Sequence, residues 1–261
     1  MVIALAAPRI ELTIDPLKAL DEIQGALSAQ KLIAKAAGGK QAAFTYEPAL
    51  LPDGTLAGAR PGSGNFSILV EGCSAHAGRN PGDGRNAVVA AADLALRLAR
   101  SARPELSVNP ARIDGGGPNN IVPDRAILRL NLRPATPADQ QDAEKTLARL
   151  AAEIAREHDV AVTLHGGFNR PPKPLDAPAE RLFALVRDCG RLLGHEIGWR
   201  DTGGVCDGNN IAALGVPAVD TMGVRGGAIH SAEEYLIVES LIERAQLSAL
   251  SLLRLAAGAT K

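Results

Sequence analysis

The chain has 261 residues, of which 46% are hydrophobic and 22% are charged, and its formal net charge is −1. This composition is typical of a folded globular protein and excludes a disordered, collagen-like or disulfide-rich chain. The near-zero charge and the lack of any apolar run of about 18 residues exclude nucleic acid and membrane as predicted partners.

The cysteines and the first residues both predict a cytoplasmic protein. Cys73, Cys189 and Cys206 are too few and too scattered for a disulfide framework or a zinc knuckle. An odd number of cysteines also suits a reducing compartment. The apolar patch at Met1–Pro8 has no basic residue before it, so we expect no secretory signal.

The first 60 residues are expected to form a helix and a short strand. After a short opening, residues 1–40 carry apolar side chains at roughly helical spacing, and Gly38-Gly39 ends this pattern. Ala42–Tyr46 is a strand candidate that leads into Glu47-Pro48. Arg60–Gly64 is a Gly/Pro hinge and marks the first domain boundary.

The middle of the chain alternates strands and helices. Strands are predicted at Asn65–Glu71, Ala111–Gly115, Ala126–Leu132 and Val160–Leu164, and helices at Asn86–Arg100 and from Thr136 to about His158. Thr136 suits the N-cap of its helix and Pro137 the first helical position. The order β-α-β-β-α-β is the ferredoxin-like pattern, a sheet with two helices on one face.

The tail continues after a stiff linker at Arg170–Pro174. It is expected to contain a helix at about 178–193, a polar glycine-rich loop at 201–210, a strand at Pro217–Thr221 and a helix at about 236–257. Because this tail lacks a sheet of its own, we expect it to pair with residues 1–60. The sequence therefore predicts an α/β chain in which one domain, 1–61 with 173–261, is interrupted by a second, 62–172.

Four polar clusters lie in predicted loops: Ala75–Asn80, Gly115–Asp124, Asp201–Asn210 and Gly226–Tyr235. His76, between alanine and glycine, has room for a ligand, and a surface-loop histidine is the alternative. The glycines of the second cluster allow close backbone approach, or simply a tight connection between strands. In the third cluster, backbone N–H groups could bind an oxyanion, or Asp207 or Asn209 could cap a following helix.

Two further residues could bind a metal ion. His230 follows a glycine-rich loop and precedes acidic residues able to orient its ring, although a lone histidine is more often structural. Glu47 lies at a strand end, where an exposed glutamate is the commoner case. Motifs of the HExxH, Walker and nucleophile-elbow types do not occur in the sequence.

Taken in order, Gly72–Asn86, Asn119–Arg133 and Gly203–Tyr235 resemble the dinuclear-zinc aminoacylase and glutamate carboxypeptidase family, which includes acetylornithine deacetylase and succinyl-diaminopimelate desuccinylase. The resemblance runs from about residue 21 to the C-terminus. It implies a metallohydrolase of amide bonds in N-acyl amino acids or C-terminal glutamate-type peptides, with two zinc ions per active site. It also implies an incomplete zinc-peptidase-like catalytic domain that lacks its N-terminal part. A ferredoxin-like lid, through which the protein is expected to form a homodimer, interrupts this domain.

The resemblance assigns metal and proton chemistry to three residues. Glu47 resembles the carboxylate ligand of the second zinc, and His230 resembles the C-terminal zinc ligand. Glu22 takes the place of the general base in the family's Glu-Glu pair. Ile23 stands where the second glutamate of that pair, a zinc ligand, is expected.

The resemblance assigns substrate recognition mainly to the lid. His76 resembles the histidine that crosses the dimer and stabilises the oxyanion in the partner's active site. Asn120 and Arg133 resemble the residues that grip the substrate carboxylate, a task that suits the planar arginine fork. Gly203 and Gly204 resemble the loop that lines the substrate cleft.

The departures from the family concern the metal site. The family's H-x-D motif is absent, and the first histidine of the chain is His76. Catalytic zinc normally takes three protein ligands, and the resemblance supplies two here. We therefore expect weak zinc binding and impaired hydrolysis by this chain. Three interpretations stay open: an incomplete catalytic domain of a hydrolase, a non-catalytic dimerisation and binding remnant, and a domain that complements a separate chain.

Overall fold

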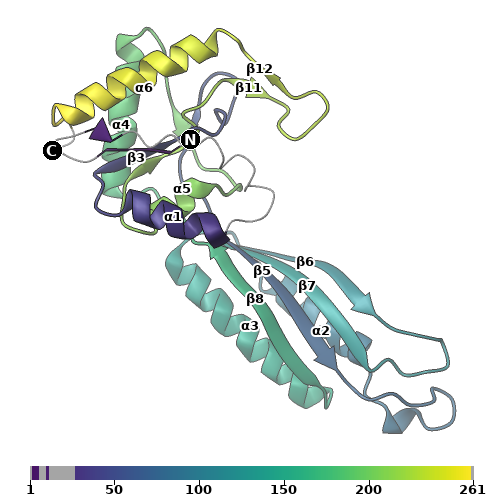
Figure 1. Ribbon diagram of the computed structural model, residues 1–261. Coiled ribbons are helices and arrows are strands. Elements are labelled where there is room, and N and C mark those ends of the chain that lie inside the picture. Colours follow the sequence, from purple (N-terminus) through teal and green to yellow (C-terminus); the bar gives the residue numbers. More distant parts are fainter. Residues whose placement is uncertain (1, 6–9, 12–26, 260–261) are drawn as a thin grey trace. The chain divides into compact units, whose positions relative to one another are not determined.

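The computed structural model describes residues 2–5, 10–11 and 27–259. The chain divides into two compact units: unit 1 comprises residues 1–61 and 173–261, and unit 2 comprises residues 62–172 (Figure 1). The helix expected within residues 1–40 is described only as α1 (Leu27–Ala37), and residues 2–5 and 10–11 are short strands. None of the helices in the described ranges is long and apolar enough to cross a membrane.

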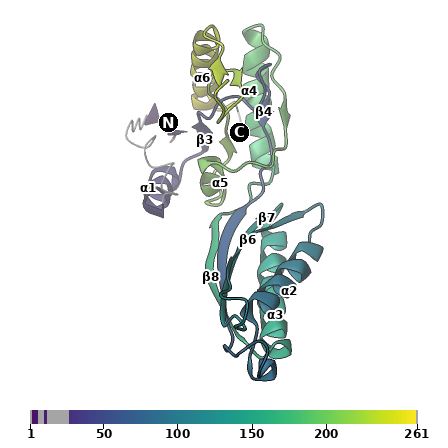
Figure 2. The same ribbon diagram turned by 90° about the vertical axis from the view of Figure 1, so that its right-hand side faces the viewer.

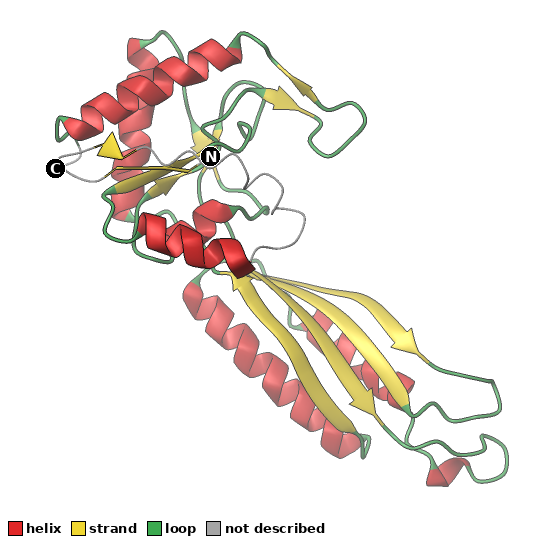
Figure 3. Cartoon of the chain, viewed as in Figure 1, coloured by secondary structure: helices red, strands yellow, loops and turns green. Residues whose placement is uncertain are grey.

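Unit 2 has the predicted ferredoxin-like order. Its elements are β5 (Ser63–Glu71), α2 (Ala87–Arg100), β6 (Leu106–Gly115), β7 (Arg125–Pro134), α3 (Pro137–Glu157) and β8 (Ala161–Arg170). The four strands form an antiparallel sheet in the order β6-β7-β5-β8 (Figure 3). Both helices cover the same face of this sheet, as Figure 2 shows. The predicted β-α-β-β-α-β order, with two helices on one face of the sheet, is therefore confirmed.

Local signals place the helix starts of unit 2 correctly. Asn86 caps α2 by accepting hydrogen bonds from the N–H groups of Val88 and Val89. Thr136 caps α3, exchanges hydrogen bonds with Asp139, and is followed by proline at the first helical position. The strands β6 and β8 are longer than predicted. The prediction missed the alternation of Leu106 and Val108 with polar residues at the start of β6, and in β8 the glycines Gly166 and Gly167 interrupt the apolar pattern.

The core of unit 2 lies between the sheet and the two helices. Phe66, Ile68 and Val70 alternate along β5 and are buried, as the period of a half-buried strand requires. They belong to one apolar cluster with Leu94 of α2 and Ile154 of α3. The opposite face of the sheet carries mainly polar side chains.

Unit 1 is built from both ends of the described chain. Its strands are β1 (Val2–Leu5), β2 (Ile10–Glu11), β3 (Ala42–Thr45), β4 (Leu56–Ala57), β9 (Trp199–Arg200), β10 (Ala218–Val219), β11 (Gly226–Gly227) and β12 (Tyr235–Leu236), and its remaining helices are α4 (Ala177–Leu192), α5 (Asp207–Ala212) and α6 (Ser240–Ala256). The tail joins the first 60 residues through parallel pairing of β10 with β3 and of β9 with β4. The predicted pairing of these two segments is confirmed.

A separate apolar cluster forms the core of unit 1. Phe44 of β3, Phe183 of α4, Val219 of β10 and Leu247 of α6 are all buried in it. The last helix begins at Ser240 rather than at about residue 236, because Tyr235 and Leu236 pair with the glycines of β11 instead. The hydrophobic periodicity of the sequence alone does not predict this pairing, because the partner strand β11 consists of two glycines.

Leu94→Ala is expected to lower the free energy of unfolding of unit 2 by about 2–5 kcal/mol, because it removes a fully buried side chain from a close-packed core. Leu96→Ala, in the same helix at a position 49% exposed, is the control and is expected to cost less than about 0.5 kcal/mol. Urea denaturation followed by circular dichroism measures both. Equal losses would contradict the burial assigned to α2.

Candidate functional site

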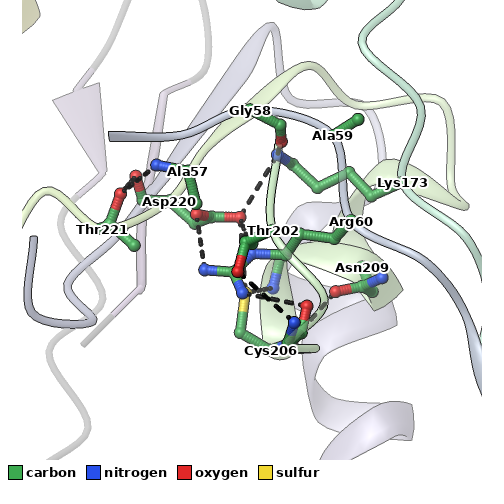
Figure 4. Close-up of polar contacts among 12 residues, drawn as sticks. Ala57, Gly58, Ala59, Arg60, Lys173, Thr202, Cys206, Asn209, Asp220 and Thr221 are labelled. Carbon is green, nitrogen blue, oxygen red and sulfur yellow. Dashed lines mark hydrogen bonds and ion pairs between the residues drawn. The ribbon is translucent and has the colours of Figure 1, made fainter. Parts of the chain in front are cut away.

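A buried carboxylate joins distant segments of unit 1. Asp220 follows β10 directly, and its side chain is fully buried. Its Oδ2 accepts a hydrogen bond from Arg60 Nε at 2.8 Å, and its Oδ1 accepts one from Arg60 Nη2 at 3.0 Å. Lys173 Nζ lies 3.2 Å from Oδ2 and donates to the carbonyl oxygen of Gly58 at 2.8 Å (Figure 4). Two cations thus pair with a carboxylate that water does not reach.

The two cations lie where the chain leaves and re-enters unit 1. Unit 2 runs from Gly62 to Pro172, so that Arg60 shortly precedes it and Lys173 directly follows it. The backbones of Arg60 and Lys173 also exchange two hydrogen bonds, both at 2.9 Å. Both crossing segments are therefore held together at one point and fixed to Asp220.

The glycine-rich loop before α5 is attached to the same cluster. The carbonyl oxygen of Gly204 accepts a hydrogen bond from Arg60 Nη1 at 3.1 Å, while Gly203 and Gly204 are themselves exposed. Cys206 Sγ donates to Asp220 Oδ2 at 3.4 Å. Burial, reinforced by the negative charge of Asp220, raises the pKa of the Cys206 thiol to about 12. The thiol is therefore a neutral hydrogen-bond donor near pH 7.

The cap of α5 differs from the sequence expectation. Its N-cap is Cys206 rather than Asp207 or Asn209. Asn209 lies in the first turn instead, where its Oδ1 accepts from the Cys206 N–H at 3.0 Å. Its Nδ2 donates to the carbonyl oxygen of Pro61 at 2.9 Å. Propensity favours aspartate or asparagine as a cap, but tertiary contacts with Asp220 and Pro61 select cysteine here.

Glu47, a predicted metal ligand, is half-buried just after β3, and its negative charge contributes to the electrostatics of this cluster. Burial lowers the pKa of Arg60, but hydrogen bonds to Asp220 and nearby negative charges, that of Glu47 included, raise it overall. Gly223 N donates to the carbonyl oxygen of Glu47 at 2.9 Å. A Cβ at residue 223 would lie 2.6 Å from that oxygen, so this close approach requires glycine.

His230, the other predicted metal ligand, is exposed in the loop between β11 and β12 (Figure 1). Its backbone is left-handed, with φ at 66°, and its N–H donates to Glu234 Oε2 at 3.0 Å. A cavity of about 220 Å³ adjoins this loop, and its walls include Pro48, Ile229 and Glu234. The chain neighbours of Glu47 and of His230 thus line one cavity.

The described residues do not assemble a complete metal site. Within the described ranges, no three His, Cys, Asp or Glu side chains come together so that they could hold a metal ion. Catalytic zinc takes three protein ligands, so Glu47 and His230 alone do not suffice. Glu22, the predicted general base, lies outside the described residues.

His76 and Asn120 are brought together in unit 2. Ala77 N donates to the carbonyl oxygen of Asn120 at 2.9 Å, and both predicted site residues are exposed. His76 Nδ1 accepts hydrogen bonds from the N–H groups of Gly78 and Arg79, each at 3.1 Å. Because Nδ1 is an acceptor, the neutral ring carries its proton on Nε2. His76 is thus oriented to donate a hydrogen bond outward.

Arg133 lies at the other end of the same sheet. It is near the end of β7, where its Nε donates to Asn131 Oδ1 at 3.0 Å, whereas Asn120 precedes the start of that strand. At about 3.4 Å per residue, the strand from Arg125 to Arg133 separates these two ends by about 27 Å. Within one copy of the chain, Asn120 and Arg133 are therefore too far apart to bind the same substrate carboxylate.

Three residues of the buried cluster escaped sequence prediction: Arg60, Lys173 and Asp220. The sequence does show two charged residues in unusual surroundings: Asp220 ends an apolar stretch, and Lys173 lies between two prolines. Such charges are rarely buried unless they are paired. Both cations also lie at the predicted domain boundaries, which points to a common partner.

The chain is similar to known proteins. Residues 58–159 match the family model of a peptidase dimerisation domain. Over 254 residues the chain is 30% identical to carboxypeptidase G2 of Pseudomonas sp. (strain RS-16), covering 94% of this chain and 60% of that protein. Residues 58–159, which make up most of unit 2, are thus similar to the M20 peptidase dimerisation domain. The whole chain spans about 60% of the length of carboxypeptidase G2.

Two further matches agree with this similarity. The chain is 29% identical over 191 residues to a succinyl-diaminopimelate desuccinylase of Xanthomonas campestris, covering 70% of this chain and 49% of that protein. The solved structure of the Bacillus subtilis YXEP protein, a dinuclear metal binding peptidase from the M20 family, superposes with a TM-score of 0.69 at 20% identity. That match covers 88% of this chain and 61% of the YXEP chain, and it supports the fold.

Asp220→Asn is expected to lower the free energy of unfolding by about 3–5 kcal/mol, because it leaves two buried cations without a carboxylate. Asp188→Asn is the control: this aspartate is 47% exposed and its ion pair with Arg191 spans 3.6 Å, so a loss below about 1 kcal/mol is expected. Thermal denaturation of the wild type and both variants measures the two losses of stability. A loss for Asp220→Asn no larger than the control would contradict the role of the cluster.

Zinc binding by this chain is expected to be weak. In a calorimetric titration, the wild type and Glu47→Gln/His230→Ala should take up zinc alike at stoichiometric concentrations, because two ligands do not make a tight site. A 1:1 site in the wild type that disappears in the double variant would show that further ligands complete the site within this chain.

Proposed function

We propose that this chain forms part of a metal-dependent hydrolase that cleaves amide bonds in N-acyl amino acids or peptides with a free carboxylate. The names of its relatives support this class of substrate, since one is a carboxypeptidase and another removes a succinyl group from diaminopimelate. The M20 peptidase dimerisation domain supports a homodimer formed through unit 2. Zinc is the proposed metal, and a dinuclear site in an M20 structure supports a pair of ions.

The geometry of His76 is the observation that carries this proposal. Amide hydrolysis develops negative charge on the carbonyl oxygen, and a preoriented N–H donor stabilises that charge. His76 has its Nδ1 held by two backbone N–H groups, so Nε2–H is the donor. The adjacent Asn120 can both donate to and accept from a substrate through its side-chain amide.

The separation of Asn120 and Arg133 supports a role for two copies of the chain. In a homodimer, one copy would contribute His76 and Asn120 to a site whose Arg133 belongs to the other copy. Arg133 would bind the substrate carboxylate in two-point fashion. Gly203 and Gly204 would line the cleft in which the substrate lies, and Arg60 holds the carbonyl oxygen of Gly204.

The described residues supply only part of the proposed metal site. Glu47 and His230 are the proposed ligands, and Glu22 the proposed base. The described residues do not complete a metal site, so the remaining ligands would come from protein beyond these residues. This same observation favours the second candidate, a dimerisation and substrate-binding module without catalytic activity of its own.

In the metal-loaded enzyme that includes the protein supplying the remaining ligands, His76→Ala is expected to lower kcat by about 100-fold or more, because removing one oxyanion donor has an effect of this size. His165→Ala, an exposed histidine on β8 of the same unit, is the control and should leave kcat within about two-fold. Hydrolysis of N-succinyl and N-acetyl amino acids and of C-terminal glutamyl peptides, followed by ninhydrin, measures both.

Two outcomes separate the two candidate functions. Hydrolysis that depends on His76 and not on His165 supports the hydrolase. Absence of hydrolysis with excess zinc, together with a dimer in analytical ultracentrifugation and substrate binding in calorimetry, favours the non-catalytic module. If His76→Ala retained full activity, the role of His76 would be refuted.

A further inference from the structure

Arg133 is held near the end of β7 by a neighbouring side-chain amide. Arg133 and Asn131 are two positions apart on the strand, so their side chains stand on the same face of the sheet. Both residues are half-buried, and Arg133 Nε donates to Asn131 Oδ1 at 3.0 Å. The direction of the Arg133 side chain therefore depends on the position of the Asn131 amide.

The amide of Asn131 is itself fixed by the adjacent strand β5. Its Nδ2 donates to Asn65 Oδ1 at 2.8 Å, to the carbonyl oxygen of Gly64 at 3.1 Å and to Ser63 Oγ at 3.2 Å. Asn65 lies directly opposite Asn131 in the register of the two strands. Ser63 and Gly64 are buried, so the amide is anchored in a packed part of unit 2.

These contacts allow only one orientation of the amide. A backbone carbonyl oxygen only accepts hydrogen bonds, so the NH2 group of Asn131 must face Gly64. The Nε–H of Arg133 only donates, so the amide oxygen must face Arg133. A flipped amide would set donor against donor and acceptor against acceptor. Asn131 thus fixes Arg133 relative to the backbone of β5.

Asn131 holds Arg133 without cancelling its positive charge. Arg125, on the same face of β7, pairs with the carboxylate of Glu71 at 2.8 Å, which compensates the charge of Arg125. The amide oxygen of Asn131 is instead a neutral acceptor. An arginine side chain has many rotamers, and holding it in place before a ligand binds reduces the entropy that is lost on binding. A fixed neutral acceptor therefore prepares an arginine to bind an anion.

We propose that Asn131 is a positioning residue that orients Arg133 to bind the carboxylate of the substrate. This inference rests on the proposed function, in which Arg133 binds that carboxylate, and it adds the residue that directs the guanidinium. With Nε donating to Asn131, the two-point contact would use the Nη1 and Nη2 groups. Asn131 acts through the arginine, so its loss should lower the preference for a carboxylate over a neutral group without weakening the other contacts of the ligand.

The orientation of Arg133 is measured first, by NMR of the full chain without ligand. The Nε–H of Arg133 is expected to exchange with water about 10-fold faster in Asn131→Leu than in the wild type, because a hydrogen bond to a charged group contributes at least this factor. Asn131→Asp keeps an oxygen for Nε and should keep the exchange slow. Ser67→Ala is the matched control: it removes an acceptor 3.0 Å from Arg129 Nη1 on the same face of the sheet and should leave the Arg133 signal unchanged.

Ligand preference is then measured by titrating the same proteins with N-acetyl-L-alanine and with its carboxamide, which differ only in the carboxylate. The wild type and Ser67→Ala should bind the carboxylate more tightly. Asn131→Leu should lose about 10-fold of this preference and bind the carboxamide as the wild type does. Arg133→Ala should lose the preference altogether. A general loss of structure would instead weaken both ligands alike, and circular dichroism verifies that each variant is folded.

The outcomes separate this inference from the proposed function. Faster exchange together with a reduced carboxylate preference in Asn131→Leu supports the inference. Unchanged exchange or an unchanged preference in Asn131→Leu, with the preference lost in Arg133→Ala, overturns the inference and leaves the role of Arg133 standing. A preference that survives in Arg133→Ala, or a wild type that shows none, overturns the role of Arg133 in the proposed function and this inference with it.

Discussion

The arrangement of unit 1 depends on the buried ion pairs that the carboxylate of Asp220 forms. This carboxylate pairs with Arg60 and Lys173, the residues on either side of the crossing into unit 2, and it accepts from the thiol of Cys206. A buried ion pair adds little net stability compared with an apolar substitute, but it requires particular partners in a particular geometry. The cluster thereby specifies where the two crossing segments and the glycine-rich loop lie relative to the sheet.

The candidate site residues of unit 1 are positioned from this cluster. The loop at Gly204 is held by Arg60, and Gly223 lets the segment after Asp220 approach the backbone of Glu47 closely. That segment continues into the loop that carries His230. In unit 2 the corresponding groups are independent of the cluster, since His76 is oriented by its own turn and sits beside Asn120. The chain thus presents two separately organised sets of polar groups.

Sequence patterns predicted most of unit 2 because its signals are local. Thr136, Pro137 and the alternation of Phe66, Ile68 and Val70 each act within a few residues. Prediction failed where distant segments decide the outcome. The cap at Cys206 is selected by Asp220, and Tyr235 is a strand residue only because Gly226-Gly227 lies beside it. The buried pairing of Arg60 with Asp220 is likewise invisible to periodicity, since 160 positions separate the two residues.

The sequence by itself determined the ferredoxin-like order of unit 2, the interruption of one domain by another, and the resemblance to a metallopeptidase family. These follow from hydrophobic periodicity, capping residues and short motifs, which are properties of neighbouring residues. Only the tertiary structure decided that Asp220 pairs with Arg60 and Lys173, that Glu47 and His230 lack a third described ligand, and that α6 keeps an apolar face open. The physical reason is that burial and charge pairing depend on which distant segments meet.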